Sequence, residues 1–177
     1  MIDVFDSRLY QIEMQEMVDA AIEKMRNEQP DFEVFTASIW TDPNAKASSI
    51  NFDDKAHSDQ HLRQHHEWAQ RHYQKNKESI DRNGPEYVKL LLKKERRNRN
   101  PADFKLRDFV EIQNDSIKID DWESEYEEQC WHELEPELKQ IAKYTLQKIR
   151  VLKLHPQFEL AVNGNRDWYQ YKWKIKQ

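Results

Sequence analysis

The chain has 177 residues, of which 37% are hydrophobic and 34% charged, and its net charge is −5. This length suits one ordinary domain, and six Trp, seven Tyr and seven Phe beside only two Gly argue against a disordered chain. The negative net charge argues against general nucleic-acid binding. No run of apolar residues approaches the ~20 residues of a membrane helix.

The first half of the chain is expected to form a long amphipathic helix followed by two antiparallel strands. Apolar residues recur at spacings of three and four over 7–28, which predicts the helix. The ranges 33–41 and 47–52 are rich in β-forming residues, and the Asp-Pro-Asn sequence at 42–44 between them indicates a turn. A helix over 57–77 has few apolar positions, so we expect it to cover an edge of the fold rather than the core.

The second half mixes short elements with one more strong helix. The predicted elements are a break at 83–85, a short helix over 86–94, a loop at 98–101, a strand over 106–113, a helix over 134–153 and a hairpin with arms 158–162 and 168–175 around a turn at 163–165. This order lacks the regular βαβ alternation of a nucleotide-binding fold. It predicts a single α+β domain over 1–177, with an antiparallel or mixed sheet of about five strands and helices packed on it.

The cysteine content and the N-terminus bear on the compartment. The one cysteine, Cys130, excludes an internal disulfide and suits a reducing compartment. The first residues show no basic segment followed by an apolar run, so no signal peptide is expected. We therefore expect a cytoplasmic protein with no membrane partner.

Histidines gather on the predicted polar helix. His57, His61 and His65 repeat every four residues and would lie along one helix face. Two histidines at this spacing can hold one zinc ion when further ligands come from elsewhere. The chain has neither paired cysteines nor a His-Glu-x-x-His motif. A solvated helix face is the simpler interpretation, and a zinc-dependent enzyme is the alternative.

No segment reads as a catalytic motif. Cys130 is followed by His132, but the acidic neighbours raise a thiol pKa, and residues two apart do not face each other on a helix. Two glycines can hardly build a phosphate-binding loop. The basic and polar segment 93–104 could contact an anion or a partner, or its Asn and Asp side chains could satisfy its own backbone. We therefore expect a protein that is not an enzyme and needs no cofactor.

The most unusual segment is acidic. Residues 120–137 include nine carboxylates and no Lys or Arg, with Trp122, Tyr126 and Trp131 interleaved. Such a surface would steer a basic protein towards it and repel nucleic acid, and Trp and Tyr are common interface anchors. The aromatic residues could equally face the core while the acids face water, and the two interpretations are compatible. The expected partner contacts are Asp120, Asp121, Trp122, Glu123, Glu125, Tyr126, Glu127 and Glu128.

Several short phrases resemble a known group of proteins. They are Ser-Ile-Trp-Thr-Asp-Pro at 38–43, the segment 98–104 with Asn-Pro-Ala-Asp-Phe at its end, Cys-Trp at 130–131 with Leu-Glu-Pro at 134–136, and Val-Asn at 162–163 before Asp-Trp-Tyr at 167–169. Together they resemble immunity proteins of bacterial polymorphic toxins and contact-dependent growth inhibition (CdiI-like). The resemblance implies a cytosolic protein that blocks one cognate toxin domain. Many such toxins are nucleases with basic clefts, which would suit the acidic segment, and no catalytic residues carry over.

Overall fold

The computed structural model describes residues 4–175, with the side chains of 127 and 128 outside the description. The elements are α1 (Ser7–Glu28), β1 (Val34–Asp42), β2 (Ala47–Asp53), α2 (Lys55–Lys75), α3 (Lys77–Asp81), α4 (Pro85–Leu91), the 3₁₀ turn η1 (Pro101–Asp103), β3 (Leu106–Gln113), α5 (Trp122–Lys148), the 3₁₀ turn η2 (Ile149–Val151), β4 (Leu154–Val162) and β5 (Tyr171–Lys174). They divide into two compact units, unit 1 (Met1–Lys55 and Arg99–Gln177) and unit 2 (Ala56–Asn98). None of the helices in the described residues is long and apolar enough to cross a membrane.

Unit 1 is built on a five-stranded mixed sheet in the order β3-β2-β1-β4-β5. β1 and β4 run parallel, and the other neighbouring pairs are antiparallel. β1 and β2 form the predicted hairpin, with Thr41 opposite Ser48 next to the turn. The predicted α+β class, with about five strands in a mixed sheet and helices packed on it, is confirmed.

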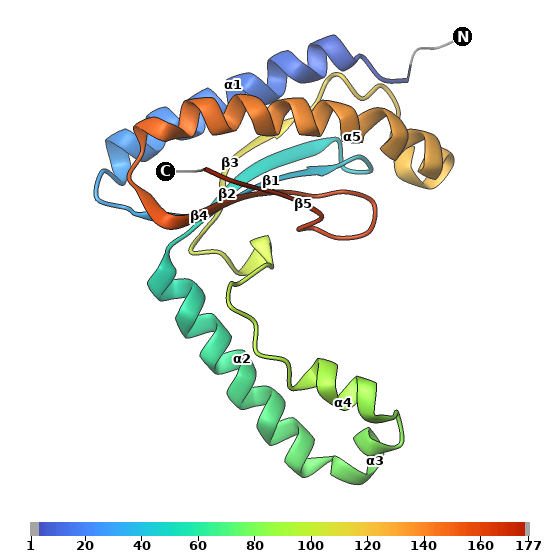
Figure 1. Cartoon of the computed structure of the whole chain (residues 1–177). Coiled ribbons are helices and arrows are strands. Elements are labelled where there is room, and N and C mark those ends of the chain that lie inside the picture. Colours follow the sequence, from blue (N-terminus) through green and yellow to red (C-terminus); the bar gives the residue numbers. More distant parts are fainter. Residues whose placement is uncertain (1–3, 176–177) are drawn as a thin grey trace. The chain divides into compact units, whose positions relative to one another are not determined.

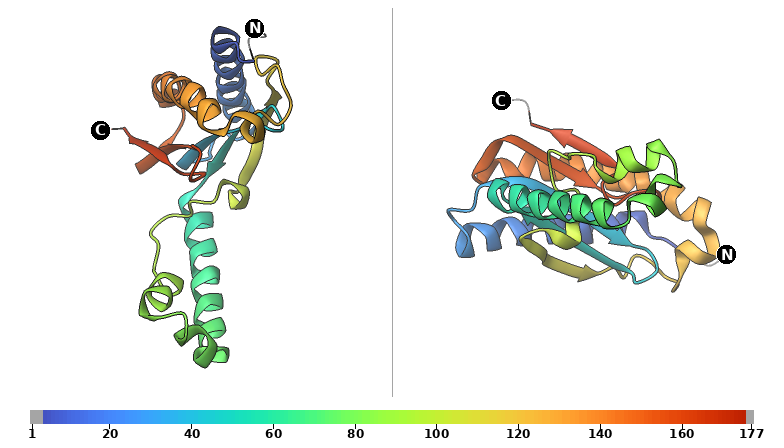
Figure 2. Two further views of the ribbon diagram at one scale, coloured as in Figure 1. Left: turned by 90° about the vertical axis from the view of Figure 1, so that its right-hand side faces the viewer. Right: turned by 90° about the horizontal axis from the view of Figure 1, so that it is seen from below.

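α1 and α5 lie side by side on one face of this sheet (Figure 1, Figure 2). They run in the same direction, since Gln11 contacts Glu137 near one end and Asp19 contacts Tyr144 further along. Their apolar stripes face the sheet, and each fully buried aliphatic side chain contributes about 1.5–3 kcal/mol relative to exposure. The largest side chains buried between helices and sheet include Trp122, Tyr10, Phe52, Met14, Met17, Met25, Ile39, Ile50, Leu134 and Leu138.

A row of buried hydroxyl groups joins α1 to the sheet through this core. The Tyr10 hydroxyl lies 2.6 Å from Thr41 Oγ1, which lies 2.8 Å from Ser48 Oγ. Ser48 in turn donates to Asn114 Oδ1 at 2.6 Å. Burial raises the pKa of Tyr10 above its ordinary value, so this phenol stays protonated and the network stays neutral.

The opposite face of the sheet is polar and also buried. Cross-strand pairs place Ser38 beside Asn51 and Thr36 beside Asp53, and all four are at most 1% exposed. The backbone N–H of Asp108 donates to Asn51 Oδ1 at 2.7 Å, and that of Lys105 donates to Asp53 Oδ1 at 3.3 Å. Buried polar groups need such partners, so hydrogen bonds hold the chain around β3 to this face, beside a small second apolar cluster of Phe104, Ala161 and Tyr169.

α5 differs most from the prediction. The helix was expected over 134–153, but it begins at Trp122, contains the acidic segment and ends at Lys148 before η2. Two local signals argue against a helix there: like charges one turn apart destabilise an isolated helix, and Pro136 removes one backbone donor. Burial of Trp122, Cys130 and Leu134 on one side of α5 outweighs both. The helix is nevertheless irregular at Tyr126, where the backbone is non-helical (φ −139°, ψ 40°).

The closing hairpin also differs in its connection. β4 begins at Leu154, four residues before the predicted arm, and β5 covers only Tyr171–Lys174. The predicted turn at 163–165 is therefore part of a longer loop, 163–170. Pro156 lies where the pairing of β1 with β4 shifts register, so its missing N–H interrupts no paired segment there.

Unit 2 consists of α2, followed by α3 and α4 and the segment that turns back beside α2 (Figure 2). Its helix α2 covers most of the predicted range 57–77, while α3 was not predicted. Only Ser58 and Ala69 of α2 are buried, in agreement with its few apolar positions. The N–H of Asn98 donates to Ser58 Oγ at 2.9 Å, which joins the end of the unit to its start.

Candidate functional site

The acidic residues at the start of α5 are mostly on the surface. Asp120, Asp121 and Glu125 are exposed, and Tyr126 is 42% exposed at the helix irregularity. Asp120 pairs with Lys46 at 2.7 Å, which offsets part of its charge. The predicted contacts Glu127 and Glu128 have side chains outside the described residues. The exposed part of this segment thus offers two unbridged acids and one aromatic ring to a partner.

Trp122 belongs to the core, which was one of the two roles that the sequence left open. Its side chain is 0% exposed, and its ring centroid lies 4.9 Å from that of Phe5. The indole Nε1 has no hydrogen-bond partner among the described residues. As placed, Trp122 cannot touch a partner, and it acts instead by fixing the start of α5.

Glu123 links the start of α5 to the β1–β2 turn. Its backbone N–H donates to Asn44 Oδ1 at 3.2 Å, and its Oε2 accepts from Asn44 Nδ2 at 3.3 Å. Its Oε1 accepts from Trp131 Nε1 at 2.8 Å. Both carboxylate oxygens are therefore engaged, and Glu123 organises this surface.

Replacing Glu123 with alanine is expected to lower the free energy of unfolding by about 1–3 kcal/mol, because it leaves the buried Trp131 Nε1–H without its acceptor. The matched control is Glu125→Ala, an exposed acid two residues away, which should change stability by less than about 0.5 kcal/mol. Urea unfolding of both variants measures the difference. Equal, small effects would show that the Glu123 contacts do not stabilise the fold.

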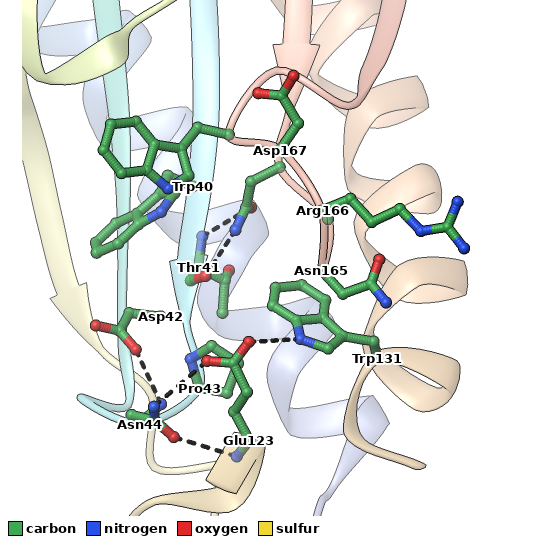
Figure 3. Close-up of a pocket in the computed structure, with 13 residues that line it drawn as sticks. Trp40, Thr41, Asp42, Pro43, Asn44, Glu123, Trp131, Asn165, Arg166 and Asp167 are labelled. Atoms are coloured by element: carbon green, nitrogen blue, oxygen red, sulfur yellow. Dashed lines mark hydrogen bonds between the residues drawn. The ribbon is translucent and has the colours of Figure 1, made fainter. Parts of the chain in front are cut away.

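A recess of about 450 Å³ lies beside Glu123 at the end of the sheet (Figure 3). Three segments line it, namely the β1–β2 turn, α5 and the loop after β4. Asp42 and Asn44 of the turn lie opposite Trp131 of α5 and Asn165 of the loop, with Glu123 at one end of the view in Figure 3 and Asp167 at the other. The full lining is Trp40, Thr41, Asp42, Pro43, Asn44, Glu123, Trp131, Asn163, Gly164, Asn165, Arg166, Asp167 and Trp168.

Side chains of the 163–170 loop hold it in place. Asn163 pairs with Thr41 through both amide atoms, accepting at 3.1 Å and donating at 2.8 Å, as a neighbouring strand would. Gln170 accepts from the backbone of Arg166 at 3.0 Å. A Cβ at Gly164 would lie 2.4 Å from Gln170 Oε1, so only glycine leaves room for this contact. The loop is therefore a defined wall of the recess.

The recess combines negative charge with aromatic surface. Asp42, Glu123 and Asp167 line it against one cation, Arg166, whose guanidinium extends away from Trp40 and Asp42 in Figure 3. Trp40 and Trp168 also line a second recess of about 350 Å³ on the polar face of the sheet. Trp168 is 54% exposed. Carboxylates beside indole faces are suited to bind a cationic group such as an arginine or lysine side chain.

The recess residues were not singled out from the sequence, although a signal for them was present. Three of the four phrases that carry the immunity-protein resemblance supply lining residues, at 40–43, 131, and 163 with 167–168. These segments are far apart in the chain and meet only at the end of the sheet. The acidic segment 120–137 contributes Glu123 and Trp131 to the lining, and Glu123 is its only carboxylate there.

The other candidate groups from the sequence belong to unit 2 or cannot react. Burial and the nearby carboxylates of Glu123 and Glu133 raise the pKa of the Cys130 thiol to about 12, so it holds almost no reactive thiolate at neutral pH. His57, His61 and His65 all lie on α2 in unit 2. Within residues 4–175 as described, no group of three or more His, Cys, Asp or Glu is placed to hold a metal ion.

Comparisons with known proteins give no relative for this arrangement. No protein-family description, curated protein or solved structure matches the chain.

Proposed function

We propose that this chain is an immunity protein, which acts in the cytoplasm by binding one cognate toxin domain and covering its active site. The toxin is a nuclease with a basic cleft. One observation carries the proposal: exposed acids at the start of α5 adjoin a recess that holds further carboxylates and a half-exposed tryptophan. The sequence phrases that resemble CdiI-like immunity proteins support it independently.

Charge is the first reason to assign a basic partner. Unit 1 contains 27 acidic and 18 basic residues, a net charge of −9 against −5 for the whole chain. Nuclease clefts are basic because they must bind phosphates. A surface of opposite sign attracts such a cleft during encounter and occupies the place of the nucleic acid.

Exposed aromatic residues provide the anchors. Tyr126 keeps the role expected for it, since its ring remains accessible beside Glu125. Trp168 takes the place of the buried Trp122 as the large anchor of this surface. Interfaces depend on a few such residues surrounded by polar contacts, and the carboxylates around the recess supply that polar rim.

The recess supports binding more than catalysis. Both oxygens of Glu123 accept hydrogen bonds from the protein, and Oδ1 of Asp42 accepts from the N–H groups of Asn44 and Ala45. Oδ1 of Asp167 accepts from the Tyr169 N–H. The lining described above includes neither His nor Cys. The expected role of these acids is to present fixed negative charge.

Reversing two exposed charges, Asp121→Lys with Glu125→Lys, is expected to slow association with the toxin domain about tenfold at low salt. The dissociation rate should change less, because short-range contacts set it. Wild-type association should itself slow as salt shortens the Debye length from ~10 Å at 0.1 M to ~3 Å at 1 M. Stopped-flow or surface-based kinetics over a salt series measures both effects.

The matched control is Glu23→Lys with Glu28→Lys. It makes the same change in net charge on exposed positions near the end of α1 that lies away from Trp122. This pair should slow association much less than the Asp121 and Glu125 pair does. If both pairs slow it equally, the effect comes from net charge, and the start of α5 is not the steering surface.

A further inference from the structure

Unit 2 has the opposite charge to unit 1. It contains ten basic and six acidic residues, a net charge of +4, and it holds five of the seven histidines. The net charge of −5 conceals this difference, and so the argument against nucleic-acid binding from the whole chain does not apply to unit 2. A basic unit of this kind is the electrostatic footprint of a polyanion site.

A groove of about 390 Å³ concentrates this charge. Arg63 of α2 lines it together with Lys93 and Lys94 from the segment after α4, and Leu62 and Leu90 add apolar surface. Lys93 pairs with Glu95, the one acid in the lining, at 2.6 Å. Within the described chain, neither Arg63 nor Lys94 forms an ion pair. The groove therefore presents exposed cations with little opposing charge.

An aromatic row continues from the groove along α2. His65 lines the groove, and its ring centroid lies 5.9 Å from that of Trp68. Trp68 stacks on His72 at 5.0 Å with an interplanar angle of 8°. The indole is nevertheless 50% exposed, and Leu90 in the groove is 67% exposed. Both side chains are therefore accessible to the flat face of a ligand ring.

We infer that the groove of unit 2 binds single-stranded nucleic acid. Arg63, Lys93 and Lys94 contact successive phosphates, and unstacked bases lie on Trp68 and on Leu90. A basic track beside aromatic platforms is the chemistry by which proteins hold single strands without reading their sequence. The cations are exposed and spread over two segments instead of converging on one point, which fits a chain of phosphates better than a single anion. The inference rests on unit 2 alone and does not depend on the toxin-binding proposal.

The test uses the full chain and a fluorescent single-stranded oligonucleotide of about 12 nucleotides, with binding followed by anisotropy. Affinity should fall steeply between about 50 and 200 mM salt. Lys93→Glu with Lys94→Glu should weaken binding about tenfold or more and flatten the salt dependence. Trp68→Ala should weaken binding about tenfold, through the loss of stacking. All three residues are exposed, so these variants should remain folded, which circular dichroism checks.

Matched controls come from unit 1. Lys143→Glu with Lys153→Glu makes the same charge change on exposed lysines outside the groove, and Trp168→Ala removes an equally exposed tryptophan. Both should leave oligonucleotide binding within about twofold of wild type. The inference is overturned by no measurable binding at low salt or by equal losses in variants and controls. Unlabelled phosphate and polyglutamate are tested as competitors in the same assay. If either displaces the labelled strand as strongly as unlabelled oligonucleotide does at similar concentration, the inference is overturned. Such displacement by phosphate would indicate a single-anion site, and by polyglutamate an acidic protein partner.

Discussion

Trp122→Ala is expected to lower the free energy of unfolding by about 3–5 kcal/mol, the largest loss of any single change considered. Trp122 is completely buried, packs against Phe5 and lies at the start of α5, so truncation leaves a cavity where helix, N-terminal segment and core meet. Urea unfolding of the whole chain, followed by far-UV circular dichroism, gives the value. A loss under about 1 kcal/mol would mean that this ring is not part of the core.

Trp122→Phe separates packing from hydrogen bonding at the same position. The indole Nε1–H is buried with no partner among the described residues, and an unsatisfied buried donor destabilises the fold by about 1–3 kcal/mol. Phenylalanine removes this donor while it keeps most of the apolar ring. The variant should therefore lose much less stability than Trp122→Ala. A loss as large as that of the alanine variant would indicate that Nε1 does have a partner, such as a bound water.

Trp168→Ala is expected to weaken binding of the toxin domain by about 2–4 kcal/mol, or roughly 30-fold to 1,000-fold, while unfolding changes by less than about 0.5 kcal/mol. The indole is half exposed and lines both the recess beside Glu123 and the recess on the polar face of the sheet. A half-exposed ring contributes little to the core but gains much when a partner buries it. Isothermal titration calorimetry measures the affinity, and urea unfolding measures the stability.

Trp68→Ala is the control for this prediction, since it removes a tryptophan of similar exposure from unit 2. It should leave toxin affinity within about twofold of wild type. If both substitutions lowered toxin affinity equally, the loss of affinity would follow from removing any exposed tryptophan and would not locate the interface at Trp168. If Trp168→Ala lowered the free energy of unfolding as much as it lowered toxin affinity, the ring would stabilise the fold and would not be an interface anchor.

α1 and most strands could be predicted from the sequence because one local pattern dominated each of them. α1 has an unbroken apolar stripe and matches the predicted range 7–28, and β3 matches 106–113. α5 was predicted to begin twelve residues too late. In the local sequence, the repeated acids and Pro136 disfavour a helix more clearly than the widely spaced apolar residues favour one. Only the tertiary burial of Trp122 and Cys130 reveals that the helix starts earlier.

The candidate surface could be predicted only in part. Composition identified the acidic segment, but whether each side chain faces water depends on how α5 packs. Trp122 is buried, and Glu123 forms hydrogen bonds with Asn44 and Trp131. The recess could not be predicted from local sequence, because Asp42, Trp131 and Asp167 come from three separate segments. The β1–β4 pairing and the packing of α5 on the sheet bring them together.

The most direct test of toxin neutralisation is a titration of the purified chain into the toxin-like C-terminal domain encoded by the adjacent gene, with nuclease activity as the readout. The proposal predicts a one-to-one complex with a nanomolar dissociation constant, which corresponds to a binding free energy of about −12 kcal/mol. It also predicts loss of nuclease activity at equimolar ratio. Trp168→Ala should shift the inhibition curve to higher concentration in proportion to its loss of affinity. A neighbouring gene with no toxin-like domain, no complex at micromolar concentration, or a tight complex in which the nuclease remains fully active would contradict the proposal.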